Sequence, residues 1–594
     1  MGVASPRATA ARPSDRLALL LVLLAYVLVA FTIFASVWTN PAYLSIGLSG
    51  DPQMFMWSLS WTSYALTHHL HPFFTDYLNY PDGANLLWSA IPTVPAVLLS
   101  PAMALWGPVV TYNLLMTLGL AASAWCAYIA FNSLIQDRLG AFLGGLLYGF
   151  SPYMLAHSLG HPNFVVCFFP PLTLLLLVEI FVKQRRPTWQ PGILLGVLGA
   201  AQLLTGNEVL FTSVLIAAAG LAVAAVLRPA GLVKRLAKSV PGVLVAAAVG
   251  LVLSAYPLYF QFFGPQHVSG VPRGIETYVT DLQNFVTPTA IMLLAPQWAV
   301  QLASKWTGNI AEWNGYVGIP LLALLVFTAV RWRSALVVAW SGLMCLGVAA
   351  LSMGPHLHIG GQLLHVPLPA RLLVGLPLFK QILPGRLMLF FFLPAGLLLA
   401  YFVQQVRQPR TTWMRPAGFI AAGLALIALL PEVPWPAAAN NVPEFFTSAA
   451  VQRIPDGSVA LVAPFAGAYS FNTAAGASTT SSAMVWQSEA GMRFRMPEGY
   501  VEVPGPGGAA LGGRPPASAL GDAMQLIQDG VPGPALTQGI RASMDADLTR
   551  WRVRTVVVGP MPSEQEMVRF FAALLNQEPE VVGGVYVWWN VQPS

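Results

Sequence analysis

The chain has 594 residues, of which 56% are hydrophobic and only 9% are charged. Soluble domains carry about 25% charged residues, so this composition excludes an ordinary soluble protein and indicates one that crosses a membrane repeatedly. The net charge of +6 comes from Lys and Arg that are scattered between apolar runs, and this scatter excludes a clustered surface for nucleic acid.

The first apolar run, from Leu17 to Trp38, follows a short Arg-containing leader. It is too long for the core of a signal peptide, so we expect a retained first span. Hydropathy predicts about eleven spans of about 20 residues each, and the three cysteines lie inside such runs as expected buried thiols. The predicted spans are 17–38, 109–134, 139–156, 163–182, 189–206, 208–227, 240–260, 315–330, 334–352, 388–406 and 416–430.

The apolar stretch 86–107 is the ambiguous segment in this count. It contains three prolines, so we expect an interfacial or re-entrant segment on the outer face rather than a span. The positive-inside rule supports this assignment, because it leaves the N-terminus and most basic loop residues in the cytoplasm. The basic residues assigned inside are Arg7, Arg12, Arg16, Arg138, Lys183, Arg185, Arg186, Arg228, Lys234, Arg235, Lys238, Arg331, Arg333, Arg407, Arg410 and Arg415. Those assigned outside, before the tail, are Arg273, Lys305, Arg371, Lys380 and Arg386.

Residues 436–594 differ in character from the membrane part, residues 1–435, because they have ordinary charge density and Gly/Pro-rich turns. An odd number of spans places this tail outside the cell. Short β-like runs alternate with helical patterns, which predicts an extracytoplasmic α/β domain. The β-like runs are Ser458–Pro464 and Arg554–Pro560, and the helical patterns are Ala519–Gln528 and Ser563–Leu575.

Asp51 is the first candidate for chemistry, in the outer loop 39–108. The stretch that follows it, Met54 to Leu70, is rich in Trp and Tyr and predicts a helix lying at the membrane interface. The positive end of that helix favours an ionised carboxylate, which could accept a proton from an acceptor hydroxyl. Asp51 could also be the N-cap of the helix, and the two roles are compatible.

Asp82 lies later in the same loop, within the turn signal Pro81-Asp82-Gly83, so a turn role competes with contact to a substrate. The nearby histidines of HHLH have no acidic or thiol partner at metal spacing, and we expect no zinc site there. Glu208, in TGNEV, stands between two predicted spans and either faces a substrate or lies at an exposed turn.

His157 and His161 follow the third span, in SPYMLAHSLGHPNF. Gly160 and Pro162 predict that the helix ends there. The two imidazoles therefore either hydrogen-bond a phosphate or sugar or cap the helix end. No metal site is predicted for them.

The outer loop 261–314 ends in Glu312-Trp313-Asn314, which leads directly into a span. Arg386, in LPGRLMLF, stands outside against the positive-inside trend. An arginine at an outer helix mouth suits an anionic ligand such as a lipid phosphate, although it could equally anchor ordinary headgroups.

This layout resembles the GT-C superfamily of membrane glycosyltransferases, particularly its actinobacterial-type members. The resemblance covers most of the chain and implies an α-helical polytopic fold with an outer C-terminal domain. It also implies transfer of a sugar from a polyprenyl-phosphate donor to a glycan, glycolipid or protein acceptor of the cell envelope. The motifs that carry it are GDPQMFMWSLSW, FFTDYLNYPDGANLLW, GFSPYMLAHSLGHPNF, EWNGYVGIPLL, LPGRLMLFF and VWQSEAGMRFRMPEGY.

The same resemblance implies roles for individual residues. The general base of the family, an acidic residue in the first outer loop, maps onto Asp51, and transfer would invert the anomeric carbon. Basic residues in outer loops hold the lipid phosphate, which implies Arg386 first and Arg273 second. Neither of the first two outer loops has a DxD motif, so no cofactor is implied, and a divalent metal is compatible with the family but not indicated here.

Two other functions fit part of the sequence. A lipid or polysaccharide transporter or flippase would explain the Pro-rich segment 86–107 as a discontinuous helix, but the chain shows no internal repeat. A non-catalytic envelope assembly protein would not need isolated outer carboxylates. Convergence of Asp51, Glu312 and Arg386 on one outer cavity would favour the enzyme.

Overall fold

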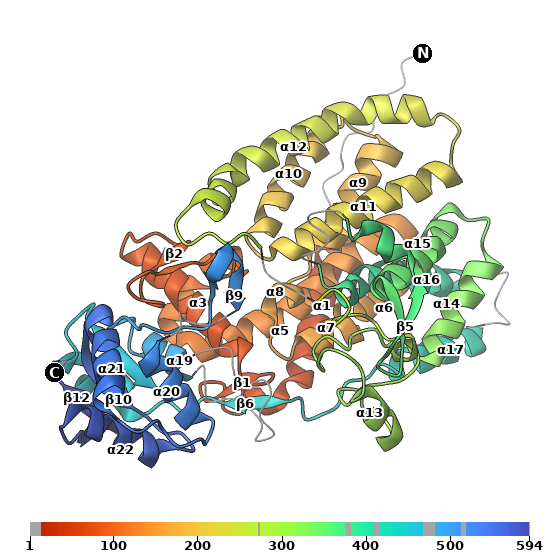
Figure 1. Cartoon of the computed structure of the whole chain (residues 1–594). Helices are drawn as coiled ribbons and strands as arrows, with labels where there is room; N and C mark the ends of the chain where they lie inside the picture. The colour runs from red at the N-terminus through yellow and green to blue at the C-terminus, as the bar shows by residue number, and fades with distance from the viewer. Residues whose placement is uncertain are drawn as a thin grey trace.

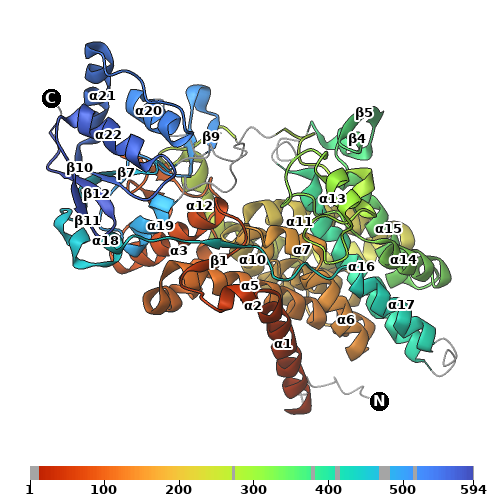
Figure 2. The same cartoon turned by 90° about the horizontal axis from the view of Figure 1, so that it is seen from below.

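The computed structural model describes residues 13–270, 274–375, 382–408, 415–466, 482–512 and 518–592. A large helical region contains the chain up to α17, and a smaller C-terminal α/β region, coloured blue, lies at one end of it (Figure 1). The view from below shows the same separation, with α1 projecting from the helical region (Figure 2).

Within the described residues, seven helical segments are long and apolar enough to cross a membrane. They are α1 (Pro13–Ile33), α5 (Ser100–Ile135), α6 and α7 (Arg138–Gly149 and Pro152–His157), α8, α9 and η1 (Pro162–Val165, Phe169–Val178 and Glu179–Lys183), α11 (Asn207–Leu227), α12 (Leu232–Phe263), and η5 and α16 (Pro384–Met388 and Leu389–Arg407). Large apolar side chains on α12, such as Val252 and Phe263, are exposed, as lipid-facing residues would be. The chain is therefore a membrane protein.

Shorter helices occupy the other four predicted spans. They are α10 (Trp189–Leu203), α14 (Ile319–Arg331), α15 (Leu336–Ser352) and α17 (Arg415–Ile427). A full span needs about 20 residues, so these four are helical as predicted, and α10, α14 and α15 are shorter than a perpendicular crossing requires.

The segment 86–107 does not form one helix. It contains the short helix α4 (Thr93–Leu98) and the first turns of α5, and Gly107 interrupts α5 with φ 75° and ψ −177°. Neither piece approaches the length of about 20 residues that a span needs, so the predicted discontinuity is confirmed.

The C-terminal region is built on a four-stranded sheet of β7 (Val459–Ala463), β10 (Val553–Val558), β11 (Glu580–Val582) and β12 (Val585–Trp589). The strand order is β11-β12-β10-β7, with β10 and β7 parallel and the other pairs antiparallel. The helices of this region are α18 (Glu444–Thr447), α19 (Ser482–Glu489), α20 (Ala519–Gln528), α21 (Gln538–Trp551) and α22 (Glu564–Leu575). These elements confirm the predicted α/β character of the tail.

The two faces of this sheet pack against different parts of the chain. Alternate residues of a strand point to opposite faces, so Leu461 packs with α20, α21 and α22, whereas Val462 packs into a second core that includes Trp57 and Trp61 of α3 (Asp51–Thr67). The two tryptophans expected to face a membrane interface are therefore buried inside the protein, while the position of α3 relative to the membrane stays a prediction. Aromatic side chains suit an interface and a protein core equally well, and here both tryptophans are buried in the core.

Short strands complete the connection between the regions. β1 (Leu44–Ile46), just before α3, pairs with β6 (Ala437–Ala439) at the start of the tail. The remaining short elements are α2 (Ala35–Trp38), β2 (Phe74–Thr75), β3 (Ala84–Asn85), η2 (Leu282–Phe285), α13 (Gln297–Ala303), β4 (His356–Ile359), β5 (Gln362–Pro367), η3 (Pro369–Leu373), η7 (Ala449–Arg453), β8 (Glu502–Pro504), η9 (Pro506–Gly508) and β9 (Ala510–Gly512). The three cysteines are buried free thiols, as predicted.

Candidate functional site

Asp51 is the first residue of α3, and its carboxylate accepts two hydrogen bonds from distant parts of the chain. Its Oδ2 lies 2.8 Å from Nε2 of His161, and its Oδ1 lies 2.6 Å from the hydroxyl oxygen of Tyr500. The N-cap residue of α3 is Gly50, so the interpretation of Asp51 as the cap was wrong. The carboxylate contacts a polar cluster rather than the helix terminus.

The turn between α7 and α8 brings His161 against Asp51. The helix ends there as predicted, and Pro162 begins α8. Space is tight at Gly160, where an added Cβ would lie 3.1 Å from Cδ of Pro52. A glycine at this position therefore allows the turn to approach the start of α3 closely.

The two histidines form a chain of hydrogen bonds that ends on Asp51. Nδ1 of His157 lies 3.0 Å from Nδ1 of His161, and Nε2 of His157 lies 3.3 Å from the side-chain nitrogen of Asn314. His161 in turn donates through Nε2 to Oδ2 of Asp51, so the three side chains and Asn314 form one connected set of hydrogen bonds.

Arg386 lies between two carboxylates. Its Nε donates to both oxygens of Glu312 at 3.0 and 3.2 Å, its Nη2 also donates to Glu312, and its Nη1 donates to Oε2 of Glu208 at 2.7 Å. Its Cζ lies 4.2 Å from the ring centroid of Phe164, a cation–π contact. Arg386 and Glu312 are both buried, and burial of charges at this depth requires such pairing.

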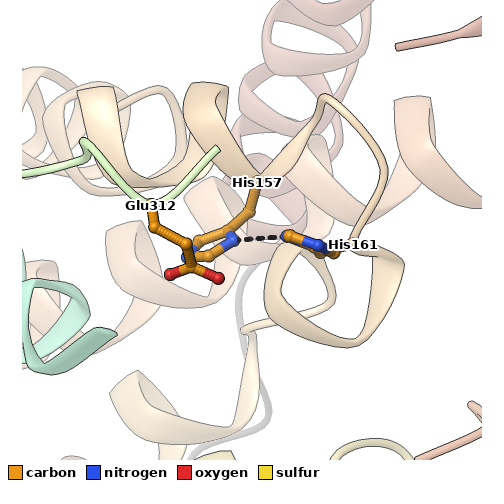
Figure 3. Close-up of side chains that lie close together, drawn as sticks. All are labelled: His157, His161 and Glu312. Atoms are coloured by element: carbon orange, nitrogen blue, oxygen red, sulfur yellow. Dashed lines mark hydrogen bonds between the residues drawn. The ribbon is translucent and has the colours of Figure 1, made fainter. Parts of the chain in front are cut away.

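The histidine pair and the arginine cluster form one continuous site. Figure 3 shows His157, His161 and Glu312 facing one another, with the two histidines joined by a hydrogen bond. In each of the three side chains, one nitrogen or oxygen atom that could bind a metal lies within 4.8 Å of the corresponding atoms of the other two. The structure thus brings together six residues predicted separately: Asp51, His157, His161, Glu208, Glu312 and Arg386.

A divalent metal would find a chemically suitable set of ligands in His157, His161 and Glu312, because two imidazoles and a carboxylate suit first-row metals. All three side chains already have partners. A metal ion would have to break the bond between the two histidines and compete with the guanidinium of Arg386 for Glu312. The positive charge that a metal would supply at this carboxylate is already present on Arg386.

Electrostatics keep Asp51 ionised. Burial alone raises the pKa of its carboxyl group, but the hydrogen bonds from His161 and Tyr500 and the charges of His161 and Arg386 outweigh burial and lower that pKa below its ordinary value. The Asp51 side chain is 23% exposed and that of His161 14%, against 3% for Glu312. The cluster is therefore more open to solvent at Asp51 and His161 than at Glu312.

An apolar groove with a volume of about 290 Å³ lies among the helices of the membrane part. α9, α11, α15 and α16 line it, with residues such as Leu174, Ile216, Trp340 and Phe390. Phe390 follows Arg386 by four residues, roughly one helical turn. The lining extends along α9 as far as Lys183, and the residues that line the groove do not include a member of the charged cluster.

The other predicted site residues do not join the cluster. Asp82 lies in a turn, as predicted, and pairs with Arg550 of α21 at 3.1 Å. The indole N–H of Trp313 donates to the carbonyl of Thr307 at 2.8 Å. Arg273 lies outside the described residues.

Sequence reasoning missed Tyr500 and Asn314. Asn314 stands in the motif EWNGY but carries no charge that would single it out in an outer loop. Tyr500 ends the motif VWQSEAGMRFRMPEGY, but nothing local links that motif to a site in another region. Only the packing of the tail on α3 brings it to Asp51.

Comparison with solved structures finds arabinofuranosyltransferase AftD from Mycobacteria, with a TM-score of 0.54, 14% sequence identity, and coverage of 97% of this chain and 40% of that one. Its R1389S mutant matches with a TM-score of 0.52 at 14% identity, over 97% of this chain and 42% of that one. The Archaeoglobus fulgidus oligosaccharyltransferase matches with a TM-score of 0.48 at 10% identity, over 94% of this chain and 71% of that one. The chain thus spans about two fifths of the length of the mycobacterial enzyme.

The likeness to the arabinofuranosyltransferase confirms the predicted GT-C fold. No curated protein matches the sequence. A family model described as a domain of unknown function, DUF6311, matches residues 22–381, which is more than half of the chain. The protein is therefore a GT-C-fold membrane protein that belongs to the DUF6311 family.

Proposed function

We propose that the protein is a membrane glycosyltransferase that moves a sugar from a polyprenyl-phosphate donor to a glycan, glycolipid or protein acceptor on the outer face of the membrane. The observation that carries the proposal is the convergence of Asp51, His161, Glu312 and Arg386 on one site in a GT-C fold. A transporter or an assembly protein would not need an ionised, partly exposed carboxylate beside a buried arginine.

Asp51 is the proposed general base. Its lowered pKa keeps it ionised at neutral pH, and each carboxylate oxygen retains a lone pair beyond the hydrogen bond it already accepts. The acceptor hydroxyl would give its proton to Asp51 while its oxygen attacks the anomeric carbon from the side opposite the leaving phosphate. The sugar would therefore be transferred in one step with inversion.

Arg386 is the proposed contact for the leaving phosphate. A guanidinium has five N–H groups, and the bonds to Glu312 and Glu208 use one on each nitrogen, which leaves two. Glu312 would keep Arg386 in place, while phosphate would compete with Glu208, to which Arg386 donates through Nη1 alone. Positive charge at this point stabilises the negative charge that develops on the phosphate as the glycosidic bond breaks.

The apolar groove is the proposed seat of the polyprenyl chain. Its lining residue Phe390 follows Arg386 by about one helical turn, a spacing that would let one ligand place its phosphate at Arg386 and its prenyl chain in the groove. Its lining is apolar along most of its length, which matches a hydrocarbon chain.

Transfer without a divalent metal is part of the proposal, because Arg386 already supplies the cation at Glu312. One assay tests which sugar and which acceptor the protein uses and whether it needs a metal. Purified protein in detergent would be incubated with a panel of radiolabelled polyprenyl-phosphate sugars and membrane acceptors. We expect a labelled product from one donor, unchanged by a chelator.

The matched variants are Asp51→Asn and Asp456→Asn, since Asp456 is an exposed aspartate of the tail. Asp51→Asn is expected to lower transfer by about 10²- to 10⁴-fold, the usual contribution of a general base, while Asp456→Asn transfers normally. Movement of intact lipid-linked sugar across vesicles without a covalent product would identify a transporter and end the proposal.

A further inference from the structure

Tyr500 connects the C-terminal α/β region to the membrane part at the proposed base. Its hydroxyl donates to Oδ1 of Asp51 at 2.6 Å, whereas His161 donates to Oδ2 at 2.8 Å. Each oxygen of the carboxylate therefore has one donor, and the two donors come from different regions of the chain.

The backbone around Tyr500 is held against the outer loop 77–89. The amide of Asn79 donates to the carbonyl of Glu498 at 3.1 Å, and the amide of Glu502 donates to the hydroxyl of Ser89 at 2.9 Å. Gly499 lies so close to this loop that an added Cβ would be 2.8 Å from Cβ of Leu78. The segment that carries Tyr500 is thus fixed on both sides of the residue.

α19 holds α3 from the same region. The buried side chain of Gln487 accepts a hydrogen bond from the indole N–H of Trp57 at 2.5 Å and donates to the carbonyl of Tyr77 at 3.0 Å. Trp57 stands on α3, less than two helical turns after Asp51. The helix that begins with Asp51 is therefore fixed by the tail along its length, and Tyr500 fixes its carboxylate.

We propose that Tyr500 is a positioning residue for Asp51, so that the C-terminal region completes the transfer site rather than only adjoining it. The hydroxyl holds the carboxylate of Asp51 in one orientation, so that one oxygen lone pair stays available to the acceptor hydroxyl. This inference rests on the proposed function, because positioning matters only if Asp51 accepts a proton.

The variant Tyr500→Phe tests the proposal, since it removes the hydroxyl and keeps the ring. We expect kcat to fall by about 10- to 100-fold, as for other residues that orient a reacting group, with the KM for the donor unchanged. A hydrogen bond to the ionised form lowers a carboxyl pKa, so its loss raises the pKa of Asp51. The acidic limb of the pH–rate profile should therefore move to higher pH.

Other groups that face Asp51 stay in place in this variant. They are His161 and His157 from the α7–α8 turn, Arg386 from η5 and Tyr112 from α5. Trp57→Phe is the matched control, because it removes a different hydrogen bond between α3 and the tail without touching the carboxylate. It should lower the melting temperature and leave the acidic limb where it is.

The outcomes separate this inference from the proposed function. If Asp51→Asn is inactive and Tyr500→Phe has the wild-type kcat and pH profile, the positioning role is overturned and the base assignment stands. If Tyr500→Phe loses activity but moves the acidic limb no more than Trp57→Phe does, its role is structural and the inference is also overturned. If Asp51→Asn transfers at the wild-type rate, the proposed base itself fails.

Discussion

The two halves of the site hold their residues by different forces. In the membrane half, Arg386, Glu312 and Glu208 form buried ion pairs. In the half that meets the tail, neutral donors such as the hydroxyl of Tyr500 and the indole of Trp57 make the contacts. Loss of one charged partner leaves a buried charge uncompensated, whereas loss of one neutral donor removes a single hydrogen bond.

This difference separates two functions within one cluster. The charged half should govern whether the membrane part folds and whether a phosphate binds. The neutral half should govern the orientation and pKa of Asp51. Variants in the first half are therefore expected to change stability most, and variants in the second half to change kcat and its pH dependence.

The largest effect on stability is expected from Arg386→Met. It leaves the buried carboxylate of Glu312 without the guanidinium that pairs with it, and breaking such a pair lowers the free energy of unfolding by about 3–5 kcal/mol. Thermal melting in detergent measures this loss. The triple variant Arg386→Met/Glu312→Gln/Glu208→Gln removes all three charges and should regain stability but not transfer. Wild-type melting of Arg386→Met would show that the cluster is not held by charge.

The variant His161→Gln should change activity more than Tyr500→Phe. The hydrogen bond and charge of His161 lower the pKa of Asp51 more than the hydrogen bond of Tyr500 does. The pKa of Asp51 should therefore rise further, and the acidic limb of the pH–rate profile should move further towards neutral pH. The profiles of both variants, measured in parallel, decide the order. A larger displacement in Tyr500→Phe would reverse the assigned roles of the two donors.

A chelator is expected to change the transfer rate by less than about 2-fold, because Arg386 already provides the cation at Glu312. Activity is measured after dialysis against the chelator and again after each of several divalent metals is added back. Loss of activity that one metal restores would mean that His157, His161 and Glu312 leave their partners to bind it.

The smallest effect is expected from Asp82→Asn. Its ion pair with Arg550 is exposed on both sides, and such pairs contribute about 0–1 kcal/mol. The melting temperature and the KM for the acceptor should both stay near wild type. A raised KM for the acceptor would show that the acceptor site includes the contact between Arg550 of α21 and the loop that carries Asp82.

The sequence allowed the prediction of much of the membrane half. Asp51, Glu208, Glu312 and Arg386 stood out because ionisable residues are rare among apolar runs. Their assignment to one side of the membrane predicted that they could meet. The pairing of Arg386 with both glutamates depends on how η5, α11 and the loop before α14 pack, which no local pattern encodes.

The tail half could not be predicted in the same way. The periodicity of the tail predicted β7, β10, α20 and α22, because strands and amphipathic helices leave a local pattern. The contact between Tyr500 and Asp51 joins residues 449 positions apart, so it leaves no local pattern in the sequence. The aromatic residues of α3 suited a membrane interface as well as a core, and their burial depends on the presence of the tail sheet.

Donor binding and single-turnover transfer, measured on one preparation of Asp51→Asn, test the central claim most directly. The account predicts that this variant binds the polyprenyl-phosphate donor within about 3-fold of wild-type affinity, since Arg386 and the groove are intact, and transfers sugar about 10²-fold or more slowly. Transfer at the wild-type rate, with the variant folded, would contradict it.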